Sequence, residues 1–163
     1  MNQETEVLLL DVVERLQRAI LARDCPAVVA LQGEETLVMS EYDYLRDADT
    51  GSAFERRAAG EGRRIAATRF VFALPQVWLP DDEGVQARAV ANLPLREGED
   101  EVVSWMSYAV DDGVDYGFVP YVRQGDGRPD FGRPTMLTTP LQPGDATPGR
   151  ELLRIVLEGR ELT

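Results

Sequence analysis

The densest group of side chains able to do acid–base chemistry is Tyr42, Asp43 and Tyr44, with Asp47 and Asp49 close behind. In an enclosed apolar site, a carboxylate with a raised pKa serves as a general base, and a tyrosine hydroxyl donates a hydrogen bond to developing charge. The alternative interpretation is a solvated loop with two partly buried tyrosines, because acidic clusters mostly lie at the surface. Tyr42, Asp43 and Tyr44 are therefore the candidate catalytic residues, and both interpretations stay open.

The residue types that are missing exclude most nucleophilic chemistry. The chain has no histidine, and all 17 of its basic residues are arginine. A Ser–His–Asp triad and a Cys–His pair are therefore excluded within this chain, as are a lysine Schiff base and a phosphate-loop lysine. Cys25 stands alone, so no internal disulfide forms, and we interpret it as a small packed residue.

Metal binding is not expected either. Zinc lacks its usual nitrogen and sulfur ligands in a chain with one cysteine and no histidine. The segment from Asp47 to Gly51 is similar to the start of a calcium loop, but that loop requires glycine at its sixth position and glutamate at its twelfth. Here the glycine comes one position early and Ala58 stands where the glutamate belongs. We expect no metal and no cofactor.

The charge balance bears on partners. With 29 acidic and 17 basic side chains, the formal net charge is −12, which repels nucleic acid and anionic membranes. We expect neither as a partner. The first residues are acidic where a signal peptide is basic, and no stretch approaches the length of a membrane span, so a cytoplasmic location is favoured. The same charge suits an acidic inhibitor or immunity-type protein that is steered to a basic target.

Small residues on one predicted strand suggest a place for a ligand. Alanines alternate with mostly polar residues along Val85 to Leu93, and protein interiors do not leave the resulting room unused. Either the first helix packs closely there, or larger neighbours wall a pocket. The candidate ligand-binding residues are Phe70, Phe72, Ala87, Ala89, Ala91 and Trp105.

The elements that must position these residues begin with a helical region. Between Val7 and Arg23, apolar residues recur every three to four positions, which predicts an amphipathic helix. Pro26 and Gly33 fit the start and the end of a short helix over 27–32. Residues 36–39 are a candidate short strand. The residues from Ser52 to Glu55 form a capping box that opens a helix ending at Gly60.

After Gly62 the apolar period changes from 3.6 to 2. The sequence predicts a strand over Ile65 to Leu74, whose continuation Pro75 and Pro80 confine to a sheet edge. Further predicted strands cover 85–93, 102–110, 114–122 (joined to the preceding strand as a hairpin) and 135–139. Residues 150–158 are predicted as a helix, with a strand over 154–157 as the alternative.

Helices first and an antiparallel meander second indicate an α+β fold, with the N-terminal helices packed on a curved antiparallel sheet. We expect one domain over 1–163. Its parts are a mainly helical region (1–62), a meander (63–140) and a C-terminal loop with a short helix (141–163).

The order of elements and one junction resemble the nuclear transport factor 2-like superfamily, which includes ketosteroid-isomerase-like and polyketide-cyclase-like proteins. The junction is Ala-Arg-Asp-Cys-Pro-Ala-x-x-Ala-Leu, from Ala22 to Leu31. The resemblance implies a cone-like sheet wrapped on helices, with an internal pocket and a homodimer, both frequent in that family. Ketosteroid-isomerase-like enzymes resemble the Tyr42–Tyr44 segment in kind, because they pair an Asp base with a Tyr donor.

Three functions follow as hypotheses. The first is a non-catalytic binding domain for a small apolar ligand or a partner protein. The second is an isomerase or lyase that uses Asp and Tyr in an enclosed pocket. The third is the acidic inhibitor or immunity-type protein named above.

Overall fold

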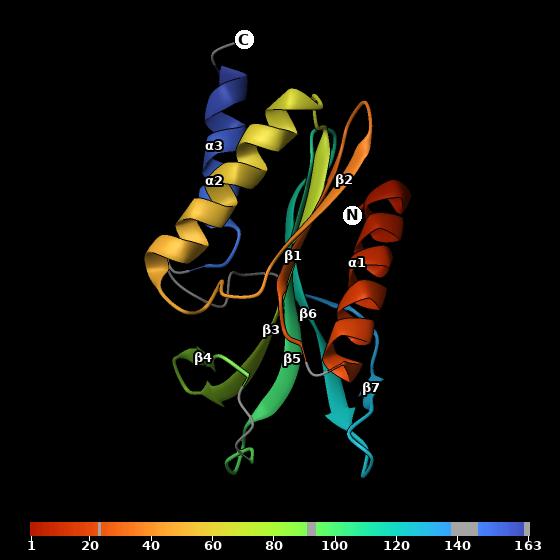
Figure 1. Cartoon of the computed structure of the whole chain (residues 1–163), viewed down its shortest axis with the longest axis vertical. Coiled ribbons are helices and arrows are strands. Elements are labelled where there is room, and N and C mark those ends of the chain that lie inside the picture. Colours follow the sequence, from red (N-terminus) through yellow and green to blue (C-terminus); the bar gives the residue numbers. More distant parts are fainter. Residues whose placement is uncertain (23, 91–93, 138–146, 162–163) are drawn as a thin grey trace.

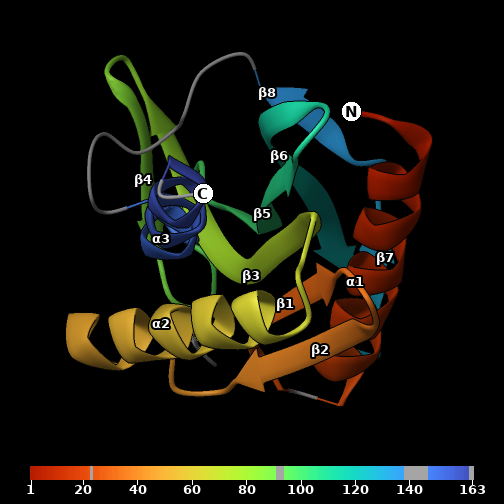
Figure 2. The same ribbon diagram turned by 90° about the horizontal axis from the view of Figure 1, so that it is seen from above.

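Helices cover both faces of a curved antiparallel sheet (Figures 1 and 2). The computed structural model describes residues 1–22, 24–90, 94–137 and 147–161. Helix α1 (Gln3–Leu21) lies on one face, and helices α2 (Ala48–Arg64) and α3 (Arg150–Glu161) lie on the other. The predicted α+β class and curved sheet are confirmed.

The sheet has the order β2-β1-β3-β5-β6-β7, with β4 added to β3 and β8 added to β6. Every pair is antiparallel. The strands are β1 (Ala27–Gln32), β2 (Thr36–Glu41), β3 (Arg69–Asp81), β4 (Gly84–Arg88), β5 (Asp100–Ala109), β6 (Gly113–Arg123), β7 (Pro129–Phe131) and β8 (Thr135–Leu137).

Helix α1 forms where its apolar period predicts it. The Asn2 side chain caps it by accepting a hydrogen bond from the backbone N–H of Thr5 at 3.0 Å. The predicted stripe packs against one face of β1, β3, β5 and β6, with Leu16 and Ile20 fully buried. Each such side chain stabilises the fold by about 1.5–3 kcal/mol through burial.

The second core lies between the opposite face of the sheet and helices α2 and α3. Phe54 of α2 and Leu152 of α3 are buried there against Phe72 of β3. Helix α2 starts earlier than the capping box predicts, because the Asp47 side chain accepts from the Thr50 N–H at 2.7 Å. The alternative of a strand near the C-terminus is wrong, since α3 spans that region.

The predicted short helix over 27–32 is wrong, because these residues form β1. Val28 and Ala30 belong to the core beneath α1, whereas Val29 and Leu31 belong to the core beneath α2 and α3. A strand buried on both faces reads as a continuous apolar run, so periodicity does not separate it from a buried helix.

The prolines of β3 lie where the strand lacks a neighbour on one side among the described strands. β1 pairs with residues 69–73 and β4 with residues 77–81, so Pro75 falls in the gap between them. Pro80 lies beyond Trp78, the last β3 residue paired with β5. A missing backbone donor is tolerated at such positions. Pro75 pairs with Val103 of β5 on its other side, and β4 covers the open side from Val77 on. The continuation of β3 is therefore an edge at Pro75 as predicted, but it is paired on both sides at Val77 and Trp78.

The strand predicted over Val85 to Leu93 is shorter than expected. β4 ends at Arg88, and Ala89, which follows it, is exposed. The remaining part of the prediction, 91–93, lies outside the described residues. The β5–β6 hairpin is confirmed, and its turn uses Gly113 at a φ of 80°. β8 confirms 135–137 of the predicted strand over 135–139, whose last two residues also lie outside the described ranges.

Candidate functional site

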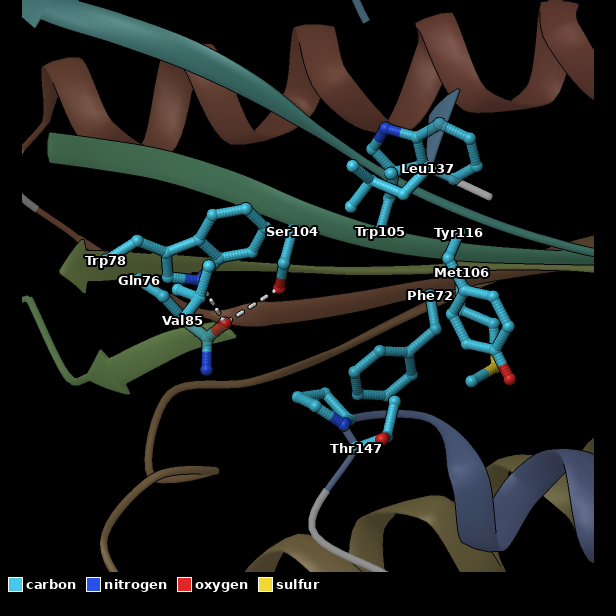
Figure 3. Close-up of a pocket in the computed structure, with 12 residues that line it drawn as sticks. Phe72, Gln76, Trp78, Val85, Ser104, Trp105, Met106, Tyr116, Leu137 and Thr147 are labelled. Atoms are coloured by element: carbon cyan, nitrogen blue, oxygen red, sulfur yellow. Dashed lines mark hydrogen bonds between the residues drawn. The ribbon is translucent and has the colours of Figure 1, made fainter. Parts of the chain in front are cut away.

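An apolar cleft opens between the sheet and the start of α3 (Figure 3). Phe72 and Trp78 of β3 and Met106 of β5 supply much of its wall. Val85 of β4 and Leu137 of β8 border it, and both are half-buried. No charged side chain lines this cleft in the described part of the chain, which sets it apart from the heavily charged surface of the molecule.

A buried amide is fixed in one orientation at one end of the cleft. Gln76 is 4% exposed, and its Oε1 accepts hydrogen bonds from Trp78 Nε1 at 3.1 Å and from Ser104 Oγ at 3.0 Å. An indole N–H only donates, so the oxygen of the amide must face Trp78. Figure 3 shows the amide nitrogen of Gln76 pointing away from both partners.

Trp105 borders the same cleft from the α1 side of the sheet (Figure 3). Its ring packs over Gly117, the residue opposite it on β6. A Cβ at Gly117 would overlap the Trp105 ring and the carbonyl oxygen of Thr135, so only glycine lets the indole lie there. The Nε1 of Trp105 is buried and has no hydrogen-bond partner in the described parts of the protein.

The space inside the cleft is small. Its volume is about 40 Å³, enough for a few waters, whereas a cavity that holds benzene measures about 150 Å³. A ring-sized ligand therefore inserts fully only if half-buried wall residues such as Val85 and Leu137 move outward. Without that movement, the cleft holds the end of an apolar ligand.

The three candidate catalytic residues differ in burial, although they border one cleft. Tyr42 is 65% exposed, and Asp43 is also exposed. Tyr44 is buried, and its hydroxyl donates to Glu55 Oε2 at 2.6 Å. All three line a separate cleft of about 400 Å³, which Ala89 also borders. The Tyr44 hydroxyl therefore already donates its hydrogen bond to Glu55, a residue that the sequence does not indicate as part of a site.

The Tyr44–Glu55 pair has shifted acid–base properties for a physical reason. Burial raises the pKa of Tyr44, and the neighbouring carboxyl of Glu55 raises it further. Burial also raises the pKa of Glu55, although Tyr44 and the backbone N–H groups at the start of α3 oppose this. One of these is the N–H of Leu152, which donates to Glu55 Oε1 at 3.1 Å. Glu55 therefore caps α3 from inside the core.

The predicted ligand-binding residues separate into different environments. Phe72 and Trp105 line the apolar cleft. Phe70 is buried beside Tyr108, with ring centres 5.6 Å apart. Ala87 lies opposite Trp78 on β4 but does not line the cleft. Ala89 is exposed, and Ala91 lies outside the described residues.

Metal-binding clusters and membrane-spanning helices are both absent from the residues that the structure describes. No group of three or more Cys, Asp and Glu side chains is arranged to hold a metal ion. Within the same ranges, no helix is long and apolar enough to cross a membrane.

Comparison with known proteins adds no relative. No protein-family model matches the chain, and neither the curated proteins nor the solved structures gave a significant match. A helix packed on a curved antiparallel sheet is compatible with the nuclear transport factor 2-like fold.

Proposed function

We propose that this chain is a non-catalytic binding domain for a small apolar ligand, and that the ligand binds in the cleft between β3, β5 and the start of α3. One observation carries the proposal. An acidic chain with a net charge of −12 has a cleft without a charged side chain in its described lining, and both of its tryptophans border that cleft. Aromatic and aliphatic walls with a few polar groups are typical of small-molecule sites.

The resemblance to the nuclear transport factor 2-like superfamily supports the proposal, because an internal pocket is frequent in that family. The cytoplasmic location and the homodimer stay predictions from the sequence. The small volume of the cleft favours a ligand that inserts one end, or one that displaces half-buried wall side chains.

The test uses the two tryptophans as reporters. Titration with indane, a neutral hydrocarbon, is followed by the two indole N–H signals in a proton–nitrogen NMR spectrum. Because Trp78 and Trp105 both border the cleft, binding there should shift both signals in a saturable way.

A matched pair of variants locates the binding. Val85→Phe places a ring at the wall of the cleft and should abolish the shifts. Gln86→Phe puts the same ring on the neighbouring exposed residue of β4 and should leave them unchanged. If indane leaves both indole signals of the wild type unmoved, or if both variants bind it as the wild type does, the proposal is wrong.

A further inference from the structure

The chemistry of the cleft restricts the polarity of its ligand. The oxygen of the Gln76 amide is already used by Trp78 and Ser104. Its Nε2 makes no hydrogen bond within the described ranges, so the amide offers donors and no further strong acceptor site to a ligand. Because two donors hold the oxygen, turning the amide over would set its N–H groups against the Trp78 N–H.

The rest of the described lining carries no charge. A charged ligand would find no opposite charge in the described lining, and burying an unpaired charge is costly. The net charge of −12 further disfavours an anion.

We infer that the ligand of this cleft is a neutral, mainly apolar molecule with a hydrogen-bond acceptor, such as a carbonyl or ether oxygen, that accepts from Nε2 of Gln76. This inference rests on the proposed function, since it specifies the ligand class of the same cleft. Gln76 is then the residue that distinguishes an acceptor-bearing ligand from a hydrocarbon of the same shape.

Three probes with one ring skeleton test the inference on the wild-type protein. They are indane, 1-indanone and indane-1-carboxylate, which carry no acceptor, a carbonyl acceptor and a negative charge. We expect 1-indanone to bind about 2- to 12-fold more tightly than indane, the range for one net hydrogen bond. The carboxylate should bind most weakly. The side-chain NH2 signal of Gln76 should shift with 1-indanone and not with indane.

The outcomes separate the two proposals. If indane leaves both indole signals unmoved, the proposed function fails. If indane binds at the cleft and 1-indanone binds no more tightly than indane, or the carboxylate binds best, the ligand class is wrong while the binding site stands.

A matched pair of variants assigns the preference to one residue. Gln76→Leu should bring the affinities of indane and 1-indanone together, and Gln86→Leu, on the exposed side of β4, should keep the difference. A difference that persists in Gln76→Leu overturns the assignment. Should Gln76→Leu fail to fold, because Trp78 and Ser104 lose their acceptor, the Gln76 NH2 signal of the wild type decides the question.

Discussion

The hydroxyl of Tyr44 lies 2.6 Å from Oε2 of Glu55, and this hydrogen bond is buried. The other carboxyl oxygen, Oε1, accepts from the backbone N–H of Leu152. One glutamate of α2 thus joins the segment after β2 to the beginning of α3. The Glu55 side chain thus reaches a backbone group 97 residues further along the chain.

Removing the Tyr44 hydroxyl should destabilise the protein. Tyr44→Phe leaves a buried Glu55 oxygen without its donor, which costs about 1–3 kcal/mol. Urea unfolding followed by circular dichroism measures the loss. Tyr42→Phe is the control, because Tyr42 is 65% exposed and its change should stay within about 0.5 kcal/mol. Equal losses in the two variants would contradict the role of this hydrogen bond.

Glu55 should make stability fall as the pH rises. Burial raises its pKa above the ordinary value of 4.5, so the folded state holds the proton more tightly than the unfolded state. The resulting stabilisation is fully present below the ordinary pKa and is lost as the pH rises through the folded pKa. The unfolding free energy of the wild type minus that of Glu55→Gln should therefore fall as the pH rises above about 4.5. If this quantity rises with pH instead, the sign is refuted.

Glu99 should show the opposite dependence. Arg88 donates to it through Nε at 2.7 Å and through a terminal nitrogen at 3.0 Å, and the backbone N–H of Arg96 donates at 2.6 Å. The hydrogen bonds from Arg88 lower the pKa of Glu99 to about 2. Its contribution is present above the ordinary pKa of 4.5 and is lost as the pH falls toward about 2.

Denaturation of wild type and Glu99→Gln over a pH series measures this effect. The variant should be less stable at neutral pH, and the difference should disappear in acid. A difference that is constant over the series would show that Glu99 acts only through packing.

Two glycines should respond to alanine in opposite directions. Gly117→Ala places a Cβ against the Trp105 ring and the carbonyl of Thr135, an overpacking that costs about 1–3 kcal/mol or more. Gly60→Ala, inside α2, meets no atom within 4 Å and should stabilise by about 0.5–1 kcal/mol. Thermal unfolding of both variants checks the signs. A stable Gly117→Ala with an unchanged Trp105 indole signal would mean that the ring does not depend on this glycine.

The parts of the fold that the sequence predicts correctly are those whose burial pattern is local. Helix α1 buries one face, so its period is visible in the chain, and the β5–β6 hairpin is marked by the turn residues that end at Gly113. β1 is different, because Val28 and Val29 face opposite cores. It pairs with β3, whose residues are far from it in the sequence. Pro26 and Gly33 at its two ends are also typical of a helix start and a helix end, so the local pattern favours the wrong element.

The candidate site was predicted only in part for a related reason. Phe72 and Trp105 stand out as large apolar residues, and both line the cleft. Gln76 and Ser104 give a weaker signal as polar residues within apolar strands. Their contact depends on the β3–β5 register, in which Ser104 lies opposite Leu74, and a single sequence does not specify register between distant strands.

The end of β3 beyond Trp78 has a consequence for amide exchange. Pairing with β5 stops at Trp78. Among the described strands, the tip from Leu79 to Gln86 is therefore a two-stranded ribbon held by β3–β4 pairing alone. Such ribbons are marginally stable by themselves, and this tip should open in fluctuations much smaller than global unfolding. Deuterium should therefore enter at Leu79 long before it enters at Met106 in the middle of the sheet. Because Val85 belongs to both the ribbon and the cleft wall, an occupant of the cleft should slow that early exchange.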